Sequence, residues 1–415
     1  MSRKYDVVIW GATGFTGRLI TQYFCKNYPP STGVTFAIAG RNEEKLMEVR
    51  LESGRVCNCS VAQVDIITAS LSGEETLDRM AASAKVVLAA AGPFDVLGTP
   101  VVDACVRQGT NYVDITGETQ WVRKIIDKHH DEAARMQISI VPCCGFDCIP
   151  ADLGCYFMVS ALRERQLVPK EVRFVMDDAS GTFSNGTCST MLHLLSSCSV
   201  QELAALMNPY CLNPRDELGG LVMPCTDPFQ FWRASDKTIP EFEKVLKCWT
   251  IPYIMQGIDC RLVNRANAVG DWMYGKDFVF SERMKVDNIV LAVVLSVFIP
   301  IIGLMMYFSV TRSILRRFLP SPGTGPSVEV QRNGFFKIKL WGRGFNTTTG
   351  EFEIITGGID AMRGDPGYLQ CSRMVSEAAL CLATKNVENE KTDLSCYGVV
   401  PPSVAFGKSL LVRLS

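Results

Sequence analysis

A strand, a glycine-rich turn and a helix follow one another near the start of the chain, and they restrict its fold more than any other segment. Residues 5–10 are rich in β-formers, and glycines at positions 11, 14 and 17 give the spacing G-x-x-G-x-x-G. A helical pattern of apolar residues follows over residues 15–24. This order is typical of the first βα unit of a dinucleotide-binding sheet. The alternative is a glycine-rich turn that caps an ordinary helix.

Each glycine has a physical role in such a unit. Gly11 permits the tight turn, Gly14 lets the backbone approach a pyrophosphate, and Gly17 lets the helix pack close to the strand. The unpaired N–H groups of the first helical turn, and the dipole behind them, favour a bound anion. We therefore predict that the turn binds a nucleotide diphosphate, through Gly11, Thr13, Gly14, Phe15, Thr16 and Gly17.

Short apolar segments then alternate with helical patterns. The further strands are predicted at residues 34–39, 61–64, 86–91, 112–115 and 138–141. This alternation predicts an α/β fold of the Rossmann type, with a doubly wound parallel sheet in the order 3-2-1-4-5-6. Ligands of such sheets bind beyond the carboxyl ends of the strands, so the residues that follow the strands are the candidates for the site.

The residues after strands 2, 3 and 4 concern the cofactor. Arg41 stands where an NAD-preferring site usually has an acidic residue, and it can pair with a 2′-phosphate, so NADP is favoured over NAD. The alternative for Arg41 is a solvated position at the start of the next helix. Asp65, which we expect to end strand 3, could contact the adenine or cap the next helix. The last cofactor candidates follow strand 4, where small residues would admit a nicotinamide ribose: Ala91, Gly92 and Pro93.

Two carboxylates follow strands 5 and 6, and they are the candidates for a proton donor. Glu118 and Asp147 would qualify if burial raised the pKa of either group. The alternatives are that Glu118 caps the following helix and that Asp147 anchors a turn. The chain contains no Tyr-x-x-x-Lys, which excludes the acid catalysis of short-chain dehydrogenases.

Charge and cysteine content narrow the class of protein further. The net charge is −1 and no long basic run occurs, so we expect no nucleic-acid partner. The 17 cysteines and three histidines form no set with metal-site spacing, and we expect reduced, mostly buried thiols, Cys144 and Cys148 included. Because the first strand begins within the first few residues, we expect no signal peptide.

An uncharged segment interrupts the second half of the chain. Residues 289–310 contain no charge over 22 positions, and one helix of that length would be roughly 33 Å long, enough to span a bilayer. Pro300 and Gly303 divide it into two arms, and globular patterns resume after it. We therefore favour a hairpin that enters one leaflet of a membrane, or the monolayer of a lipid droplet, over a spanning helix. A buried core helix is the third alternative.

The second half also defines the predicted domains. A hairpin is predicted around residues 332–334, a strand at 353–355 and a helix over 366–383, whereas residues 249–263 are predicted to be extended. The predicted boundaries are 1–150 for the nucleotide-binding domain, 151–287 for the first part of a second α+β domain, 288–311 for the membrane segment and 312–415 for the completion of the second domain, including a C-terminal helix that packs back.

Several motifs together resemble those of the saccharopine dehydrogenase-like oxidoreductases. They are GATGFTG at 11–17, AGR at 39–41, AGPF at 91–94, DITGE at 114–118, CGFDCIPADLG at 144–154, DPGY at 365–368 and the ending GVVPPSVAFGKSLL. The resemblance covers almost the whole chain. It is greatest to the branch associated with membranes and lipid droplets, which also carries an apolar insert, and it extends to mycobacterial trans-acting enoyl reductases of glycolipid synthesis. It implies a Rossmann domain, a second domain with a largely antiparallel sheet, and NAD(P)-linked redox chemistry.

Three functions follow as hypotheses. The first is an NADP(H)-dependent oxidoreductase of lipid metabolism that acts on a lipid-like substrate. We expect it to face the cytosol from a membrane or lipid droplet, with the mitochondrion as the alternative organelle. The second is a non-catalytic nucleotide-binding protein of lipid surfaces, and the third is a saccharopine enzyme of the lysine pathway. The third would need an arginine clamp for several carboxylates, and Arg261 and Arg265 form no recognisable pair. A homo-oligomer is compatible with each.

Overall fold

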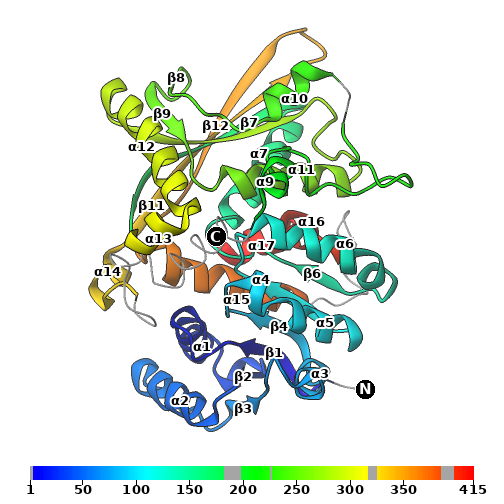
Figure 1. Cartoon of the computed structure of the whole chain (residues 1–415), viewed down its shortest axis with the longest axis vertical. Helices are drawn as coiled ribbons and strands as arrows, with labels where there is room; N and C mark the ends of the chain where they lie inside the picture. The colour runs from blue at the N-terminus through cyan, green and yellow to red at the C-terminus, as the bar shows by residue number, and fades with distance from the viewer. Residues whose placement is uncertain (1–2, 182–197, 225–226, 316–324, 385–396) are drawn as a thin grey trace. The chain divides into compact units, whose positions relative to one another are not determined.

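The chain folds into two compact units. The structure is a computed structural model that describes residues 3–181, 198–224, 227–315, 325–384 and 397–415 (Figure 1). The first unit holds the chain up to Phe146, Gly325 and the described residues from Gly367 onward, and the second unit holds the remaining described residues. The chain thus returns to the first unit after Pro366, whereas the sequence placed residues 312–415 with the second domain.

A parallel sheet of seven strands forms the centre of the first unit. Its order is β13-β6-β5-β4-β1-β2-β3, and every pair is parallel. The first six strands confirm the predicted doubly wound order, and β13 is an additional strand beside β6. The strands are β1 (Tyr5–Trp10), β2 (Phe36–Gly40), β3 (Asp65–Thr68), β4 (Ala84–Ala89), β5 (Asn111–Asp114), β6 (Ser139–Val141) and β13 (Gly398–Val399).

Helices from both ends of the chain cover this sheet. They are α1 (Phe15–Asn27), α2 (Glu43–Cys57), α3 (Glu74–Ser83), α4 (Phe94–Leu97), α5 (Thr99–Arg107), α6 (Thr119–Arg135), α15 (Cys371–Ala383), α16 (Pro402–Phe406) and α17 (Lys408–Leu414), with a 3₁₀ turn at Pro30–Thr32 and a π turn at Pro366–Gln370. Helix α15 packs against β1, β4 and β5 and is buried at every position except Arg373.

A buried carboxylate joins α15 to the N-terminal part of the unit. Glu377 accepts hydrogen bonds from the hydroxyls of Tyr23 (2.7 Å) and Tyr28 (2.6 Å), and it pairs with Arg413 (2.9 Å). The two tyrosines belong to α1 and the residue that ends it, and Arg413 belongs to α17. One side chain therefore fixes three helices whose residues lie far apart in the sequence.

A mixed sheet of six strands forms the second unit, in the order β12-β11-β7-β10-β9-β8. Only the β7–β10 pair is parallel, which confirms a second domain with a largely antiparallel sheet. The strands are β7 (Val168–Ser180), β8 (Glu241–Glu243), β9 (Cys248–Pro252), β10 (Val279–Val286), β11 (Phe335–Phe345) and β12 (Phe352–Ala361). The helices are α7 (Ile149–Glu164), α9 (Val200–Leu206), α10 (Pro228–Ala234), α11 (Gln256–Val269), α12 (Ile289–Tyr307), α13 (Ser309–Leu315) and α14 (Val328–Asn333).

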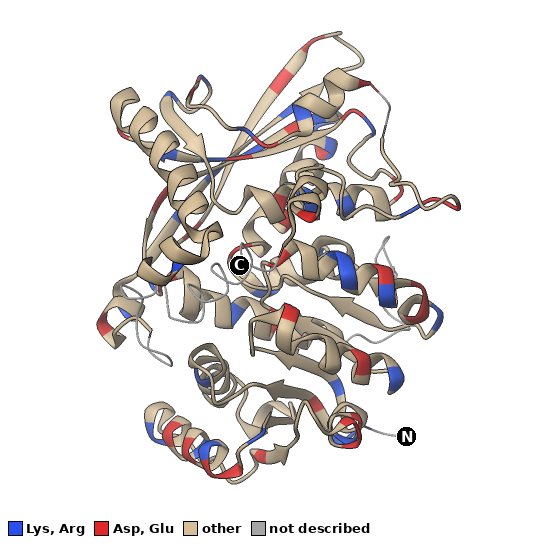
Figure 2. Ribbon diagram, in the orientation of Figure 1, with Lys and Arg blue, Asp and Glu red and all other residues tan. Residues whose placement is uncertain are grey.

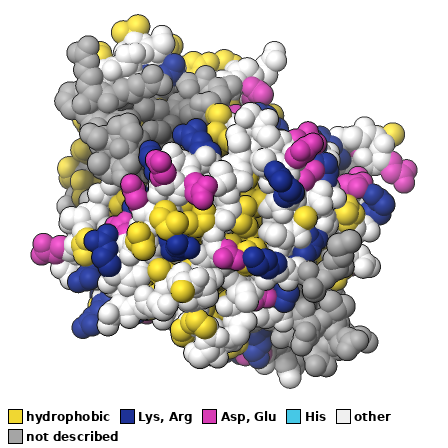
Figure 3. All heavy atoms as spheres, turned by 90° about the horizontal axis from the view of Figure 1, so that it is seen from below, with side chains coloured by type: hydrophobic (Ala, Val, Ile, Leu, Met, Phe, Trp, Pro, Cys, Tyr) yellow, Lys and Arg dark blue, Asp and Glu magenta, His cyan; other side chains and the backbone are white. Residues whose placement is uncertain are grey.

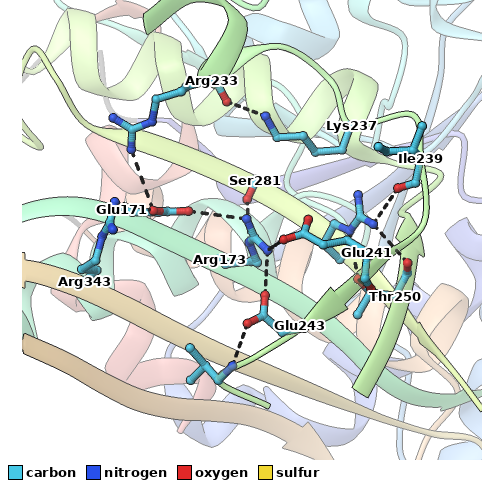
Figure 4. Close-up of polar contacts among 12 residues, drawn as sticks. Glu171, Arg173, Arg233, Lys237, Ile239, Glu241, Glu243, Thr250, Ser281 and Arg343 are labelled. Carbon is cyan, nitrogen blue, oxygen red and sulfur yellow. Dashed lines mark hydrogen bonds and ion pairs between the residues drawn. The ribbon is translucent and has the colours of Figure 1, made fainter. Parts of the chain in front are cut away.

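The two faces of this mixed sheet differ in chemistry. Helices α7 and α11 pack on one face, where β7 and β11 contribute apolar residues such as Phe174 and Leu340. The other face carries a charged group around Arg173, which pairs with Glu241 (2.9 Å) and Glu243 (2.7 Å) of β8 (Figure 4). Glu171 of the same strand pairs with Arg343 of β11 at 3.0 Å. These contacts tie three strands together across the sheet.

Three sequence predictions in these units are wrong. The third strand is β3 (Asp65–Thr68) rather than residues 61–64, because the β-branched Ile66, Ile67 and Thr68 are the residues that pair with β2. The hairpin predicted around residues 332–334 is instead α14, since the side chain of Ser327 accepts the N–H of Val330 and starts a helix. Residues 249–263, predicted to be extended, leave β9 after Pro252 and enter α11.

Helix α12 contains most of the uncharged segment, and it is exposed. Of its residues only Ala292 is buried, and large side chains such as Val290 (69% exposed) and Phe298 (57%) meet solvent. Figure 2 shows α12 without a charged residue. By contrast, positive and negative side chains are interspersed over the molecular face drawn in Figure 3. By length and composition, α12 is long and apolar enough to cross a membrane.

The path of α12 differs from the predicted hairpin. The helix continues through Pro300 and Gly303, because proline has a helical φ and costs one backbone hydrogen bond, and glycine also accepts helical angles. The chain bends later, at Phe308, where the backbone is extended. Near its start the helix is fixed to the mixed sheet, with Ala292 and Leu295 packed against Ile251 and Val286.

Candidate cofactor and proton-transfer site

The turn after β1 has the backbone shape that the glycine pattern predicts. Gly11 has a φ of +82°, and a Cβ there would lie 2.7 Å from the Cβ of Ala91. A Cβ on Gly17 would lie 2.2 Å from the carbonyl oxygen of Gly11. At positions 11 and 17, therefore, only glycine allows the turn after β1 to approach both the start of α1 and Ala91, which lies two residues beyond β4.

The start of α1 fits an anionic group. Gly14 is the N-cap, it is exposed, and it offers no side-chain oxygen to the first N–H groups of the helix. The first turn contains no acidic residue. Thr13 precedes this position and Thr16 lies two residues after it. A helix N-terminus with unpaired N–H groups is a suitable cradle for a diphosphate.

Phe15 does not offer its ring to this cradle. The ring lies edge-to-face against Tyr368, with centroids 5.0 Å apart, and it also borders Gly325. Both contacts lie within the first unit. The predicted role of Phe15 at the cofactor is therefore restricted to its backbone, while Tyr368 of the DPGY motif holds its side chain.

The other cofactor candidates divide into two groups. Arg41 follows β2 at the carboxyl edge, is exposed, and takes part in no ion pair among the described residues, so its guanidinium is available to a phosphate. Ala91, Gly92 and Pro93 follow β4 at the same edge. The Gly92–Pro93 peptide bond is cis.

Asp65 lies at the opposite edge of the sheet, and its predicted contact with adenine is wrong. It begins β3 rather than ending it, and its carboxylate accepts a hydrogen bond from Tyr5 (2.5 Å) and pairs with Lys4 (2.8 Å). These residues stand at the amino end of β1. The hydrogen bonds from Lys4 and Tyr5 lower the pKa of Asp65, so this carboxylate stabilises the edge away from the site.

Glu118 is a buried anchor in the structure. Its two oxygens accept the backbone N–H groups of Phe94 (2.7 Å) and Asp95 (2.9 Å), which start α4. It therefore caps α4, and not the helix α6 that follows it. These donors stabilise the carboxylate form, so we assign Glu118 to positioning the loop after β4 rather than to proton donation.

Asp114, at the end of β5, is a residue that the sequence analysis did not select. It is fully buried, and its Oδ1 accepts the N–H groups of Thr116 and Cys143, both at 3.0 Å. Burial raises the pKa of Asp114 to about 7, against the opposing effect of these hydrogen bonds. Its position at a strand end was the available signal. The side chain joins the loops that follow β5 and β6.

Asp147 retains the features of a proton donor. Desolvation by the surrounding protein raises the pKa of Asp147 to about 6. Its side chain is nevertheless exposed, and exposure tempers such a shift because water screens the charge.

The described residues contain no group of three or more His, Cys, Asp or Glu side chains that could hold a metal ion.

Two further carboxyl groups interact within the second unit, and no local sequence pattern marks either of them. Asp259 of α11 and Glu282 of β10 are fully buried, and no lysine, arginine or histidine of the described residues pairs with either carboxyl group. A hydrogen bond between them requires a proton on one of them. Burial raises the pKa of Glu282 to about 8 and raises the pKa of Asp259 well above its ordinary value. Nearby groups raise these pKa values further: Cys148 and Asp147 act on Asp259, and Asp236 and Asp147 act on Glu282.

Comparison with known proteins identifies the family. The description "Saccharopine dehydrogenase NADP binding domain" applies to a family model that matches residues 7–141. A Mycobacterium tuberculosis protein, provisionally named a trans-acting enoyl reductase, is 36% identical over 99% of this chain and 96% of its own. The trans-acting enoyl reductase of Mycobacterium leprae is 31% identical with the same coverage.

The chain belongs to the saccharopine dehydrogenase-like oxidoreductases. Its fold is similar to that of saccharopine dehydrogenase (L-Glu forming) from Saccharomyces cerevisiae, with a TM-score of 0.50 and 12% identity over 99% of this chain and 96% of that one. As a member of this family, it is an NADP-dependent oxidoreductase, and the predicted cofactor is confirmed.

Replacing Arg41 tests how this saccharopine dehydrogenase-like protein selects its cofactor. We expect Arg41→Gln to weaken NADPH binding roughly tenfold or more and to leave NADH binding unchanged, because a charge-assisted contact to the 2′-phosphate is lost. Fluorescence titration measures both affinities. Arg55→Gln removes an exposed arginine from the end of α2 and serves as the control. Equal loss for both nucleotides would contradict this role of Arg41.

The buried carboxyl pair predicts a pH-dependent stability. Because the pKa of Glu282 is higher in the folded protein than in the unfolded chain, the folded protein binds more protons between about pH 4.5 and pH 8. The free energy of unfolding should therefore fall as the pH rises through this window. We expect Glu282→Gln to remove at least about 1 kcal/mol of that fall, as measured by denaturant unfolding from pH 5 to pH 8.5. The exposed Glu329→Gln should keep the wild-type slope; an unchanged slope in Glu282→Gln would refute the assignment.

Proposed function

We propose that this protein is an NADPH-dependent reductase of lipids, attached to a membrane or lipid-droplet surface by α12. The observation that carries the attachment is the exposure of a 19-residue helix without a charge. The mycobacterial relatives are named as enoyl reductases, which supports an unsaturated acyl group as the substrate.

The mixed sheet supports attachment to one leaflet rather than a bilayer crossing. Strand β10 precedes α12 and β11 follows α13, and both strands pair with β7. A helix that crossed a bilayer would leave these two strands on opposite sides of it. Because α12 and α13 connect strands of one sheet, α12 would lie in the interface with its apolar side chains among the lipid chains.

The proposed reaction adds a hydride and a proton across a carbon–carbon double bond. NADPH, when bound, supplies the hydride to the β-carbon and becomes NADP⁺. The protein must supply the proton to the α-carbon, and Asp147 is the candidate because it follows β6, at a strand end where ligands of such sheets bind, and its pKa is raised above the ordinary value. Glu118 positions the loop after β4, as described above.

The contacts of two buried arginines weigh against a saccharopine-type substrate. Arg261 pairs with Asp236 and donates to the carbonyl oxygens of Leu206 and Met207, and Arg265 donates to that of Leu212. Both guanidinium groups hold the chain between α9 and α11. They are therefore engaged in the fold and are not available as a clamp for a polycarboxylate.

An enzyme assay tests the proposed reaction. Purified full-length protein should oxidise NADPH in the presence of an α,β-unsaturated acyl lipid in vesicles, followed by the absorbance of NADPH. Asp147→Asn should lower kcat by about 10²- to 10⁴-fold while NADPH binding persists, because general acid catalysis is lost. Asp131→Asn, an exposed change on α6, is the control. NADPH binding without turnover on such lipids would favour the non-catalytic alternative.

A flotation assay tests the attachment. The full-length protein should float with phosphatidylcholine vesicles, and Val294→Asp with Phe298→Asp should abolish flotation, because each charge placed in hydrocarbon costs about 2.5–3.5 kcal/mol. Val96→Asp changes an exposed valine of α4 and should float as the wild type does. Unimpaired flotation of the α12 double variant would exclude this helix as the anchor.

A further inference from the structure

The hairpin formed by β8 and β9 continues the exposed surface of α12. Trp249 of β9 packs against the cluster that holds the start of α12, which contains Ile251, Val286 and Ala292. Phe242 of β8 lies directly opposite Trp249 in the strand pair, and their rings meet edge-to-face with centroids 5.3 Å apart. Figure 1 shows both strands beside α12. The aromatic pair therefore borders the apolar helix.

Charged contacts fix which side of the hairpin faces outward. Glu241 and Glu243 point to Arg173 on the charged face of the sheet, as Figure 4 shows. Successive strand residues point to opposite sides, so Phe242 between them points to the side of Trp249 and α12. Phe242 is 44% exposed, although it is a large apolar residue in a short strand.

The turn of this hairpin has an amphipathic composition. Its four residues are Lys244, Val245, Leu246 and Lys247. Both lysines are exposed, and neither takes part in an ion pair among the described residues. The two glutamates of β8 are occupied by Arg173, and Asp177 of β7 is occupied by Lys285 and Lys339. Asp287, which follows Val286, is exposed. The hairpin turn and the start of α12 thus carry two positive charges against one negative charge.

Aromatic rings and lysines beside an apolar helix match the layers of a phospholipid surface. The helix side chains suit the acyl region, aromatic rings suit the boundary with water, and lysines suit phosphate and carboxylate groups above it. A droplet of neutral lipid alone would not favour the two unpaired cations. Their charge is complementary to acidic headgroups.

We propose that the β8–β9 hairpin is a headgroup-binding element, which directs the α12 surface to lipid layers that contain acidic phospholipids. The proposal rests on the attachment through α12 and adds the class of lipid to it. Lys244 and Lys247 would bind the acidic headgroups, while Phe242 and Trp249 lie at the level where the helix enters the layer.

Co-sedimentation of the full-length protein with two kinds of vesicle tests the proposal. One kind contains phosphatidylcholine alone, and the other replaces a third of it with phosphatidylserine. Each lysine near an anionic surface contributes about fivefold to the affinity, so we expect the wild type to bind the acidic vesicles roughly tenfold or more tightly at low salt. The double change Lys244→Gln and Lys247→Gln should remove this preference and preserve binding to phosphatidylcholine.

A matched control separates the hairpin from net charge. Lys26→Gln with Lys276→Gln removes two exposed lysines from other elements, changes the net charge by the same amount, and should retain the preference. Equal binding of the wild type to both vesicles, or the same loss in both double variants, would overturn the headgroup role while leaving the attachment in place. Binding to neither vesicle, with a dimer in solution, would instead assign the α12 surface to a second copy of the chain and contradict the attachment itself.

Discussion

Strand β7 hydrogen-bonds to β10 on one side and to β11 on the other, and this double pairing decides what the apolar helix between those strands can do. The ladders fix both ends of the connection to a single sheet. An uncharged helix that is long enough to span a membrane thus connects two strands of a single sheet. The same sheet, through Ile251 and Val286, also fixes the first turns of α12.

The cofactor unit depends on a second constraint of similar kind. Gly17 and Gly11 allow backbone atoms to approach more closely than any side chain would permit, and this brings the start of α1 to the carboxyl edge of the parallel sheet. The charge of the helix terminus is then available to a ligand because Gly14 caps the helix without a side chain. The family model of an NADP-binding domain matches residues 7–141, which include this turn.

Sequence reasoning succeeded where one local pattern determined the outcome. The strand order of the first unit followed from apolar segments and helices that alternate, and the glycine spacing indicated the turn. It failed where competing local patterns fit one segment. Residues 61–64 looked like a strand, although β3 begins at Asp65, and the alternation after Ser327 also suited a helical turn once that serine acted as a cap.

The buried pair Asp259 and Glu282 could not be predicted, because their proximity arises only when α11 packs on β10. Glu118 was found by its position, but its hydrogen bonds to the start of α4 were not foreseeable from spacing.

The return of the chain to the first unit has a consequence for biosynthesis. Helix α15 covers β1, β4 and β5, and β13 shields the edge of β6. A ribosome releases these two elements only after the whole mixed sheet has emerged. Until then, the nascent nucleotide-binding unit presents an uncovered apolar face and an unpaired strand edge, both of which chaperones recognise. Its core closes last, although its first strand is made first.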